Sequence, residues 1–375
     1  MYSVRKLNLP HSVQCDELAL AAGELYSRAT VSFWRTVRRK GIWLKPSSMM
    51  RWHNSNSLHA HSADAVVQSF YGALKSWRRR RKSDLNAHPP RRQRHFYRVQ
   101  WKSSAIRLRD GHLVLSNGKG NDPLIVPWRW DTPVLVELGW NGAGYELRAV
   151  YTAATTATPL GEETAGVDLG EIHLAATHDG HNCRIYNGRH LRSVRRYQNK
   201  VKANFAARLD RMKRGSIRWR RLRARKGAIL RHLDNQVRDI LHKQTTSLVS
   251  TLHQTGVQTV AMGDVRDIRQ GLDYGAKANQ KLHQWLHGKV RWMVSYKAES
   301  RGMRVELVDE AYTSQACPAC GQQHKTRGRD FRCGCGFRYH RDGVGAYNIR
   351  AKYLGGMGSP VVGAMASPIG VRYVL

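Results

Sequence analysis

The chain has 375 residues, with 63 Lys or Arg against 27 Asp or Glu, so its formal net charge is +36. Such an excess indicates a large polyanionic partner and argues against a small acidic substrate. The apolar runs are well short of the ~18 residues that a membrane-spanning helix needs, which excludes an integral membrane protein. The length allows two or three domains, at roughly 100 to 200 residues each.

The first half of the chain changes its periodicity twice. Residues 1–10 alternate as a short strand does, and helical spacing of apolar residues follows over 13–39 and 60–81. After Pro89-Pro90 the pattern has period two, with a turn at Asp110-Gly111. We therefore predict a small β domain formed by 1–10 and 90–160, with a helical insertion at 11–89.

The second half alternates strands and helices. From Thr164 onward, turns at Asp179-Gly180 and Asn187-Gly188 predict a three-stranded meander, and a long helical region from about 191 to 252 is interrupted near Gly215. We expect a strand at 257–263, a helix over about 279–300, a strand at 304–309 and a last helix from about Asp342. The tail, 355–375, is rich in Gly and small residues and is expected to be flexible.

Four of the six cysteines form two short pairs. Cys317 and Cys320 are followed, after twelve intervening residues, by Cys333 and Cys335. Zinc binds four thiolates in a tetrahedron, and two cysteine knuckles around a hairpin supply them. The pattern predicts a structural zinc, because four thiolates leave no open position for catalysis. Cys15 and Cys183 stand alone and are interpreted as buried thiols.

Two aspartates have contexts that suit a metal-dependent hydrolase. Asp168 lies in the apolar stretch Gly166-Val167-Asp168-Leu169-Gly170, and Asp342 opens the last helix. Alone, the first could begin a turn and the second could be a helix N-cap. With a third acid from an intervening strand, they would offer the oxygen ligands that Mg²⁺ prefers.

Several motifs together resemble the TnpB family of transposon-encoded proteins. They are the stretch 166–170, Tyr296-Lys297-Ala298, residues 310–315, the four cysteines, and His340-Arg341-Asp342 with Ala346, Asn348 and Ile349. Their order and spacing match over about 160–352, whereas residues 1–160 match in architecture alone. The resemblance implies an α/β fold: an RNase H-like (RuvC-like) nuclease domain at 161–312 and 341–354, with a zinc-binding target-nucleic-acid module at 313–340. It also implies a wedge domain at 1–10 and 90–160 and a helical recognition domain at 11–89.

Family membership implies an activity and partners as well. TnpB proteins are RNA-guided, Mg²⁺-dependent DNA endonucleases, ancestral to type V CRISPR effectors, that cut target DNA next to a short flanking motif. The resemblance implies guide RNA and target DNA as partners, two Mg²⁺ ions and one structural Zn²⁺ as cofactors, and no membrane. The N-terminal residues lack the features of a secretory signal. We therefore expect a location in the cytoplasm of a prokaryotic cell, with the nucleoid.

One position departs from the family pattern. The family's second acid is usually a Glu at the end of the middle strand, and Gly263 stands there in Ala261-Met262-Gly263-Asp264-Val265. We predict that Glu310, at the end of the next core strand, takes over, so that Asp168, Glu310 and Asp342 are catalytic and hold Mg²⁺. Asp264 is the alternative replacement, although period two places it on the opposite face from Gly263. An inactive site is the third interpretation.

Basic runs with adjacent aromatic residues are the expected nucleic-acid contacts. Lys and Arg neutralise phosphates, while exposed aromatic rings stack on unpaired bases. A charged run is often only a solvated face, but three such runs together, at 78–82, 91–98 and 192–231, favour a channel that binds the polynucleotide backbone. The predicted nucleic-acid-binding residues are Trp77, Arg78, Arg79, Arg80, Arg81, Lys82, Arg91, Arg92, Arg94, Arg195 and Arg196.

Two other functions remain open at this point. Gly263 is compatible with a nuclease-dead, RNA-guided DNA-binding repressor, which would bind target DNA without cutting it. An RNA-independent transposase or resolvase would cut DNA when purified free of RNA. The basic excess is larger than a single short duplex site demands, which argues against this last alternative.

Overall fold

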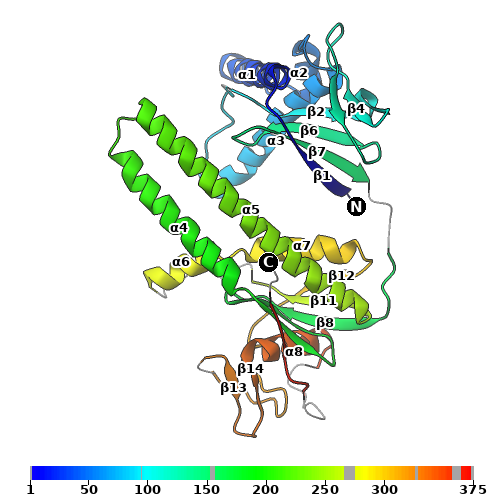
Figure 1. The fold of residues 1–375 in the computed structure, drawn as a ribbon, viewed down its shortest axis with the longest axis vertical. Helices are drawn as coiled ribbons and strands as arrows, with labels where there is room; N and C mark the ends of the chain where they lie inside the picture. Colours follow the sequence, from blue (N-terminus) through cyan, green and yellow to red (C-terminus); the bar gives the residue numbers. More distant parts are fainter. Residues whose placement is uncertain are drawn as a thin grey trace. The chain divides into compact units, whose positions relative to one another are not determined.

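The computed structural model describes residues 2–93, 95–152, 157–265, 275–325, 328–356 and 365–372, without the side chains of 276–278. It divides into two compact units, unit 1 (Met1–Ala154) and unit 2 (Thr155–Leu375), which are described one at a time (Figure 1). No helix among the described residues is both long and apolar enough to cross a membrane.

Unit 1 combines two antiparallel sheets with three helices. The four-stranded sheet has the order β1-β7-β6-β2 and the three-stranded sheet the order β3-β4-β5. The strands are β1 (Tyr2–Leu9), β2 (Val99–Lys102), β3 (Ile106–Arg109), β4 (His112–Leu115), β5 (Leu124–Pro127), β6 (Leu135–Trp140) and β7 (Tyr145–Thr152), with a 3-10 turn, η1 (Ser103–Ala105), after β2.

The helices of unit 1 are inserted between its first two strands. They are α1 (Val13–Lys40), α2 (Pro46–Trp52) and α3 (Ala60–Arg81). The Ser12 hydroxyl caps α1 by accepting a hydrogen bond from Cys15 N, and Gly41 ends the helix with a φ of 65°. Helix α3 packs against α1 and β2, so helices and strands share one apolar core. The predicted strand and both predicted long helices are confirmed.

Unit 2 contains a six-stranded mixed sheet with the order β12-β11-β8-β9-β10-β15. Strands β8, β9 and β10 form the predicted antiparallel meander, and β11 and β12 continue the sheet in parallel with β8. The bounds are β8 (Glu163–Asp168), β9 (His173–His178), β10 (Cys183–Asn187), β11 (Val257–Gly263), β12 (Arg304–Val308) and β15 (Ile369–Val371).

Helices cover both faces of this sheet. They are α4 (Arg189–Asp210), α5 (Ile217–Gln254), α6 (Ala276–Gln284), α7 (His287–Glu299) and α8 (Arg341–Tyr353). Val167, Val260 and Met262 of the sheet share a core with α5 and α7, while Ala176 and Ala261 pack against α8. Because side chains alternate along a strand, the residues next to these cores can be assigned to a face. Asp168 and Gly263 both belong to the face that α8 covers.

Three features of unit 2 refine or correct the sequence interpretation. The long helical region breaks between α4 and α5 at Gly215, whose φ is 85°. The helix expected over 279–300 is divided in two at Trp285 and Leu286. Residues 369–371 of the tail that was expected to be flexible form β15, which pairs in parallel with β10. Backbone hydrogen bonding to an open sheet edge holds this part of the tail.

Candidate active site and metal centre

Two glycines let helix α8 approach the end of strand β8. A Cβ on Gly166 would lie 2.7 Å from Arg350 N, and a Cβ on Gly345 would lie 2.6 Å from Asp168 Oδ2. Either distance is too short for a real Cβ contact: a side chain at 166 would collide with the backbone of α8, and one at 345 would displace the Asp168 carboxylate. The close approach brings Asp168, the last residue of β8, to the helix whose first turn carries Asp342.

Glu310 fills the space above Gly263. An added Cβ on Gly263 would lie 2.6 Å from both Cγ and Cδ of Glu310 and would overlap its Oε1. Strand β12 pairs in parallel with β11, and the register joins Gly263 to Val308, two residues before Glu310. The glutamate therefore folds back over the end of β11, into the volume that a side chain at 263 would occupy.

The acids at this edge repel one another. Burial, together with the charges of Glu310 and Asp342, raises the pKa of Asp168 well above its usual range, and Arg341 opposes the shift. Burial and the charges of Asp264 and Asp309 raise the pKa of Glu310 to about 7. Glu310 Oε1 is buried and has no hydrogen-bond partner among the described residues. A buried carboxylate oxygen without a donor, next to other acids, is the environment that a divalent cation would relieve.

Asp342 has partners of its own. Its Oδ2 lies 2.7 Å from His173 Nδ1, and its backbone N donates to His340 Nδ1 at 3.2 Å. Arg329 Nη1 lies 3.1 Å from the His173 ring nitrogens. One ligand atom each from His173, His340 and Asp342 lie within 4.8 Å of one another. The acids Asp168, Glu310 and Asp342, which the structure also describes, do not form a group as close as this. In this structure Asp342 is thus engaged by histidine, while Asp168 is electrostatically coupled to both other acids.

Asp264, the alternative replacement, has a different environment. Its backbone N donates to Val308 O at 2.8 Å, and its Oδ1 lies 3.7 Å from Arg291 Nη1. Its position one residue after Gly263 places it on the other face of β11. The geometry therefore favours Glu310 over Asp264 as the acid on the Asp168 face.

The four predicted cysteines form a compact cluster. Cys317 Sγ lies 3.7 Å from Cys335 Sγ, and Cys320 Sγ lies 3.5 Å from Cys333 Sγ. A tetrahedron of Zn–S bonds of about 2.3 Å places sulfur atoms about 3.8 Å apart. The second pair lies in the turn between β13 (Asp330–Arg332) and β14 (Arg338–His340). The cluster could hold zinc, because four sulfur ligands at these distances match its geometry.

The cysteine hairpin is joined to the acidic edge by hydrogen bonds. Asn348, buried in α8, donates from Nδ2 to Thr313 O at 2.7 Å and to Ala316 O at 2.8 Å, which fixes the chain just before Cys317. Arg329, just before β13, reaches His173 as described above. The fold of the hairpin thus affects the surroundings of Asp342.

The predicted nucleic-acid contacts have mixed environments. The basic run at the end of α3 and Arg91, Arg92 and Arg196 are exposed, Arg195 is half-buried, and Arg94 lies outside the described residues. Trp77 is buried: its Nε1 donates to Ala87 O at 2.8 Å and its ring packs against Trp34. The expectation that Trp77 meets nucleic acid is corrected, because its indole belongs to the core of unit 1. Trp43, 44% exposed and under the Arg78 guanidinium at 5.0 Å, is an aromatic that the sequence interpretation missed.

Comparison with known proteins agrees with the motif order. A family model described as "Probable transposase" matches residues 145–269, and a "Cas12f1-like, TNB domain" model matches 287–349. A TnpB-like protein of Methanocaldococcus jannaschii is 32% identical over 136 residues, which cover 36% of this chain and 46% of the relative. Over this segment the chain is similar to TnpB-like proteins.

Other TnpB-related proteins match parts of the chain. The CRISPR-associated endodeoxyribonuclease Cas12f1 of Sulfoacidibacillus thermotolerans is 30% identical over 112 residues, which cover 29% of this chain and 25% of the relative. The chain therefore spans less than half of the length of these two relatives. The fold resembles that of Cas12f1 in its complex with guide RNA and target DNA, with a TM-score of 0.61 at 12% identity, covering 90% of this chain and 81% of that one.

Several residues around the acids were not found from the sequence. Gly345 and Gly166 act through the side chains they lack, and His173 and Arg329 are single residues without a motif. The one available signal was Gly345 in the last helix. A glycine inside a helix is unfavourable unless close packing requires it, so Gly345 could have indicated a close contact.

Proposed function

We propose that this TnpB-family chain is an RNA-guided, Mg²⁺-dependent DNA endonuclease that cuts target DNA next to a short flanking motif. Unit 2 supports an RNase H-like assignment, because three antiparallel strands are followed by two parallel ones, β11 and β12, on the β8 side. The relatives' names support the nuclease activity. The +36 charge supports polynucleotide partners, guide RNA and target DNA.

Asp168, Glu310 and Asp342 are the proposed catalytic acids and Mg²⁺ ligands. Bound as a pair, the cations would stabilise the attacking water and the leaving oxygen of the phosphodiester. Asp168 is coupled to both other acids, so it is best placed to share a cation with each of them. His173 holds the Asp342 carboxylate in place through the 2.7 Å contact.

The observation that carries this proposal is the Glu310 carboxylate in the volume above Gly263. A lost acid at 263 would leave that volume empty or filled by an apolar side chain. Instead, a carboxylate with an unpartnered oxygen lies there, on the face of the sheet that also holds Asp168. The acid is supplied from the end of β12 rather than from β11.

The four cysteines are proposed to hold one structural Zn²⁺. The distances between their sulfur atoms fit, and the ligand set leaves no open position for substrate. The Phe337 backbone N–H, by hydrogen bonding, is the main cause of a lowered pKa of Cys335, about 7, which favours the thiolate that zinc needs. The metal would stabilise the hairpin that carries Arg329.

The test is cleavage of a guide-matched DNA by protein loaded with guide RNA and Mg²⁺. We expect Asp168→Ala to lower the cleavage rate by about 10³-fold or more, the upper range for removing one electrostatic stabiliser, while DNA binding persists. Cleavage by Asp168→Ala at the wild-type rate would show that the acids are misassigned. Sequencing the RNA that copurifies with the protein tests guidance separately, since a guided enzyme carries one defined transcript.

Two rival functions have specific support. Gly263 favours a nuclease-dead, RNA-guided repressor, which predicts a gel shift without cleavage by the wild-type protein. The family description "Probable transposase" favours an enzyme that acts without RNA, which predicts cutting by protein stripped of nucleic acid. Running both assays with and without guide RNA separates the three functions.

A further inference from the structure

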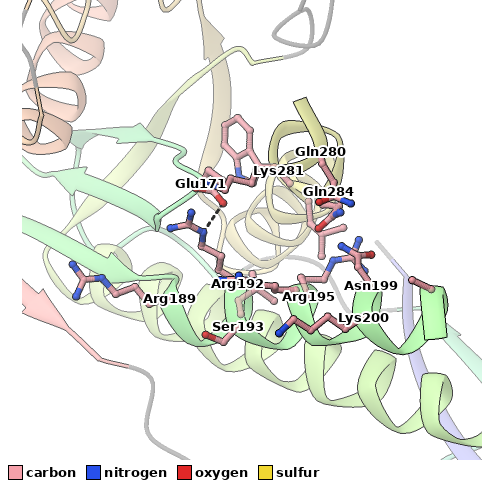
Figure 2. A pocket seen from close by; sticks show the side chains of 15 residues that line it. Glu171, Arg189, Arg192, Ser193, Arg195, Asn199, Lys200, Gln280, Lys281 and Gln284 are labelled. Carbon is pink, nitrogen blue, oxygen red and sulfur yellow. Dashed lines mark ion pairs between the residues drawn. The ribbon is translucent and has the colours of Figure 1, made fainter. Parts of the chain in front are cut away.

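A basic pocket lies in unit 2 between helices α4 and α6, and none of the three proposed catalytic acids lines it. Its volume is about 790 Å³, within the range of roughly 300 to 1,000 Å³ typical of ligand sites. Figure 2 shows side chains of α4, among them Arg195, Asn199 and Lys200, on one wall and Gln280, Lys281 and Gln284 of α6 on the other.

The charge of this pocket suits a phosphate. Its lining contains six cationic residues and one acid, Glu171, whose Oε1 is already paired with Arg192 Nε at 2.9 Å. Arg195 is held in place, since its Nη1 donates to Gln198 Oε1 at 2.7 Å and Gln198 Nε2 donates to Asp234 Oδ1 at 2.7 Å. Arg195 Nε is buried and has no hydrogen-bond partner among the described residues. A fixed guanidinium with an unused buried donor is prepared for an anionic acceptor.

The rest of the lining suits a base. Trp285 and Leu191 are buried and, with Leu286, give the pocket an apolar part, while Asn199, Gln280 and Gln284 offer amide donors and acceptors. Inside a concave pocket, amide groups can read the edge of a base only if that base is unpaired and turned out of a helix. A regular duplex would present only its backbone to such a concave site.

We propose that this α4–α6 pocket binds one unpaired nucleotide of a single-stranded polynucleotide. The phosphate lies between Arg195 and Lys281, and the base lies in the apolar part of the pocket, within reach of Gln284. The proposal rests on the proposed function for its supply of polynucleotide, and it adds a site that distinguishes unpaired from paired nucleic acid. RNA and DNA share this chemistry, so the experiment includes both.

The test measures binding of fluorescent single strands of about 15 nucleotides, as RNA and as DNA, and of the matching duplexes, to the full chain in about 0.15 M salt. Arg195→Gln and Lys281→Gln remove one charge from opposite walls. Lys202→Gln, exposed on α4 outside the pocket, removes the same charge as a control. We expect both pocket variants to weaken single-strand binding roughly tenfold and to change duplex binding no more than Lys202→Gln does. A stronger loss with RNA than with DNA would assign the nucleotide to RNA, and the reverse to DNA.

A second readout keeps the result independent of folding. Gln284→Leu keeps the charge and should change the preference among homopolymer single strands without changing the salt dependence of binding. Equal small losses for all three charge variants on every probe would overturn the pocket while leaving the proposed function intact. Failure of the wild-type chain to bind any probe would overturn both. Thermal melting of each variant identifies any variant that fails to fold. If Arg195→Gln or Lys281→Gln fails, the binding measured with the other one tests the pocket.

Discussion

The cysteine cluster and the acidic edge of the sheet are both candidate metal sites, and they are built in opposite ways. The four thiols lie within 19 residues of one another in sequence, in one hairpin and the knuckle before it, with sulfur distances of 3.5 and 3.7 Å. The acids come from a strand end, a loop and a helix, and they repel one another. A closed set of soft ligands can be specified by local spacing, whereas an open set of carboxylates depends on the whole sheet.

The acidic edge illustrates how such a dependent site could change its ligands. The register of β11 and β12 brings Glu310 to Gly263, and we propose that this acid replaces the one that position 263 lacks. A cysteine of the hairpin could not be replaced in this way, because no other described Cys, His or acid lies within the same 4.8 Å group. The predictions below test this difference.

The largest effect is expected from removing one zinc ligand. Cys333→Ser should abolish stoichiometric zinc binding, unfold the hairpin and lower the melting temperature, because a structural zinc contributes folding free energy directly. Zinc content by mass spectrometry and a thermal melt measure this. Cys15→Ala, a buried thiol in unit 1, is the matched control and should keep one zinc per chain. Full zinc in Cys333→Ser would contradict the four-cysteine site.

A smaller but more specific effect is expected at Gly263. Gly263→Ala adds a methyl group where Glu310 lies, so the carboxylate must move, and cleavage should fall by about 100-fold with DNA binding retained. Gly288→Ala, in α7 with no neighbour within 4 Å of the added Cβ, is the matched control and should cleave normally. Normal cleavage by Gly263→Ala would show that the position of Glu310 is not used.

The burial of Glu310 beside other acids predicts a pH-dependent stability. The pKa of Glu310 is raised from 4.5 to about 7 in the folded chain, so the folded state binds more protons than the unfolded state between these values. Stability without Mg²⁺ should therefore fall as pH rises through this window, and Glu310→Gln should stabilise the chain by about 2 kcal/mol at pH about 8 and by little at pH about 4. Chemical denaturation at both pH values measures this.

Two controls sharpen this prediction. Glu306→Gln, which changes an exposed acid on β12, four residues before Glu310, should show no such pH dependence. Added Mg²⁺ should stabilise the wild-type chain more than Glu310→Gln, because only the wild type has the full set of ligands. If Glu310→Gln were less stable than the wild type at high pH without Mg²⁺, the unfavourable burial of the Glu310 charge beside other acids would be contradicted.

The smallest effect is expected at Trp77. Trp77→Phe removes the Nε1–H that donates to Ala87 O, so the free energy of unfolding should fall by about 1 kcal/mol with RNA and DNA affinity unchanged. Arg78 is exposed on the same helix. Arg78→Gln should therefore weaken nucleic-acid binding and leave the free energy of unfolding unchanged. Urea denaturation and a binding titration distinguish the two roles.

Much of the local structure could be predicted, because local physical rules decide it. Helix α3 has the predicted bounds, and the break at Gly215 and the Gly41 end of α1 follow from backbone conformations that glycine favours. The cysteine cluster followed from spacing. Glu310 was predicted from the convergence of strand ends, and its position above Gly263 favours that choice.

The remainder depends on tertiary contacts that leave no periodic signal. Trp77 lies beside a basic run, but the inward face of α3 buries it. Strand β15 exists only because β10 offers an open edge. The contacts of His173 with Asp342 and Arg329 join residues more than 150 positions apart. The α4–α6 pocket forms because the chain breaks at Trp285, which the continuous helical pattern concealed.

The most direct measurement is the cleavage rate of Glu310→Ala beside that of Gly263→Glu combined with Glu310→Ala, both loaded with guide RNA and Mg²⁺. If Glu310 supplies the acid that position 263 lacks, the single variant should be nearly inactive. The double variant should then cleave at least about tenfold faster than the single variant. Wild-type cleavage by Glu310→Ala would contradict the account, as would a double variant no faster than the single one.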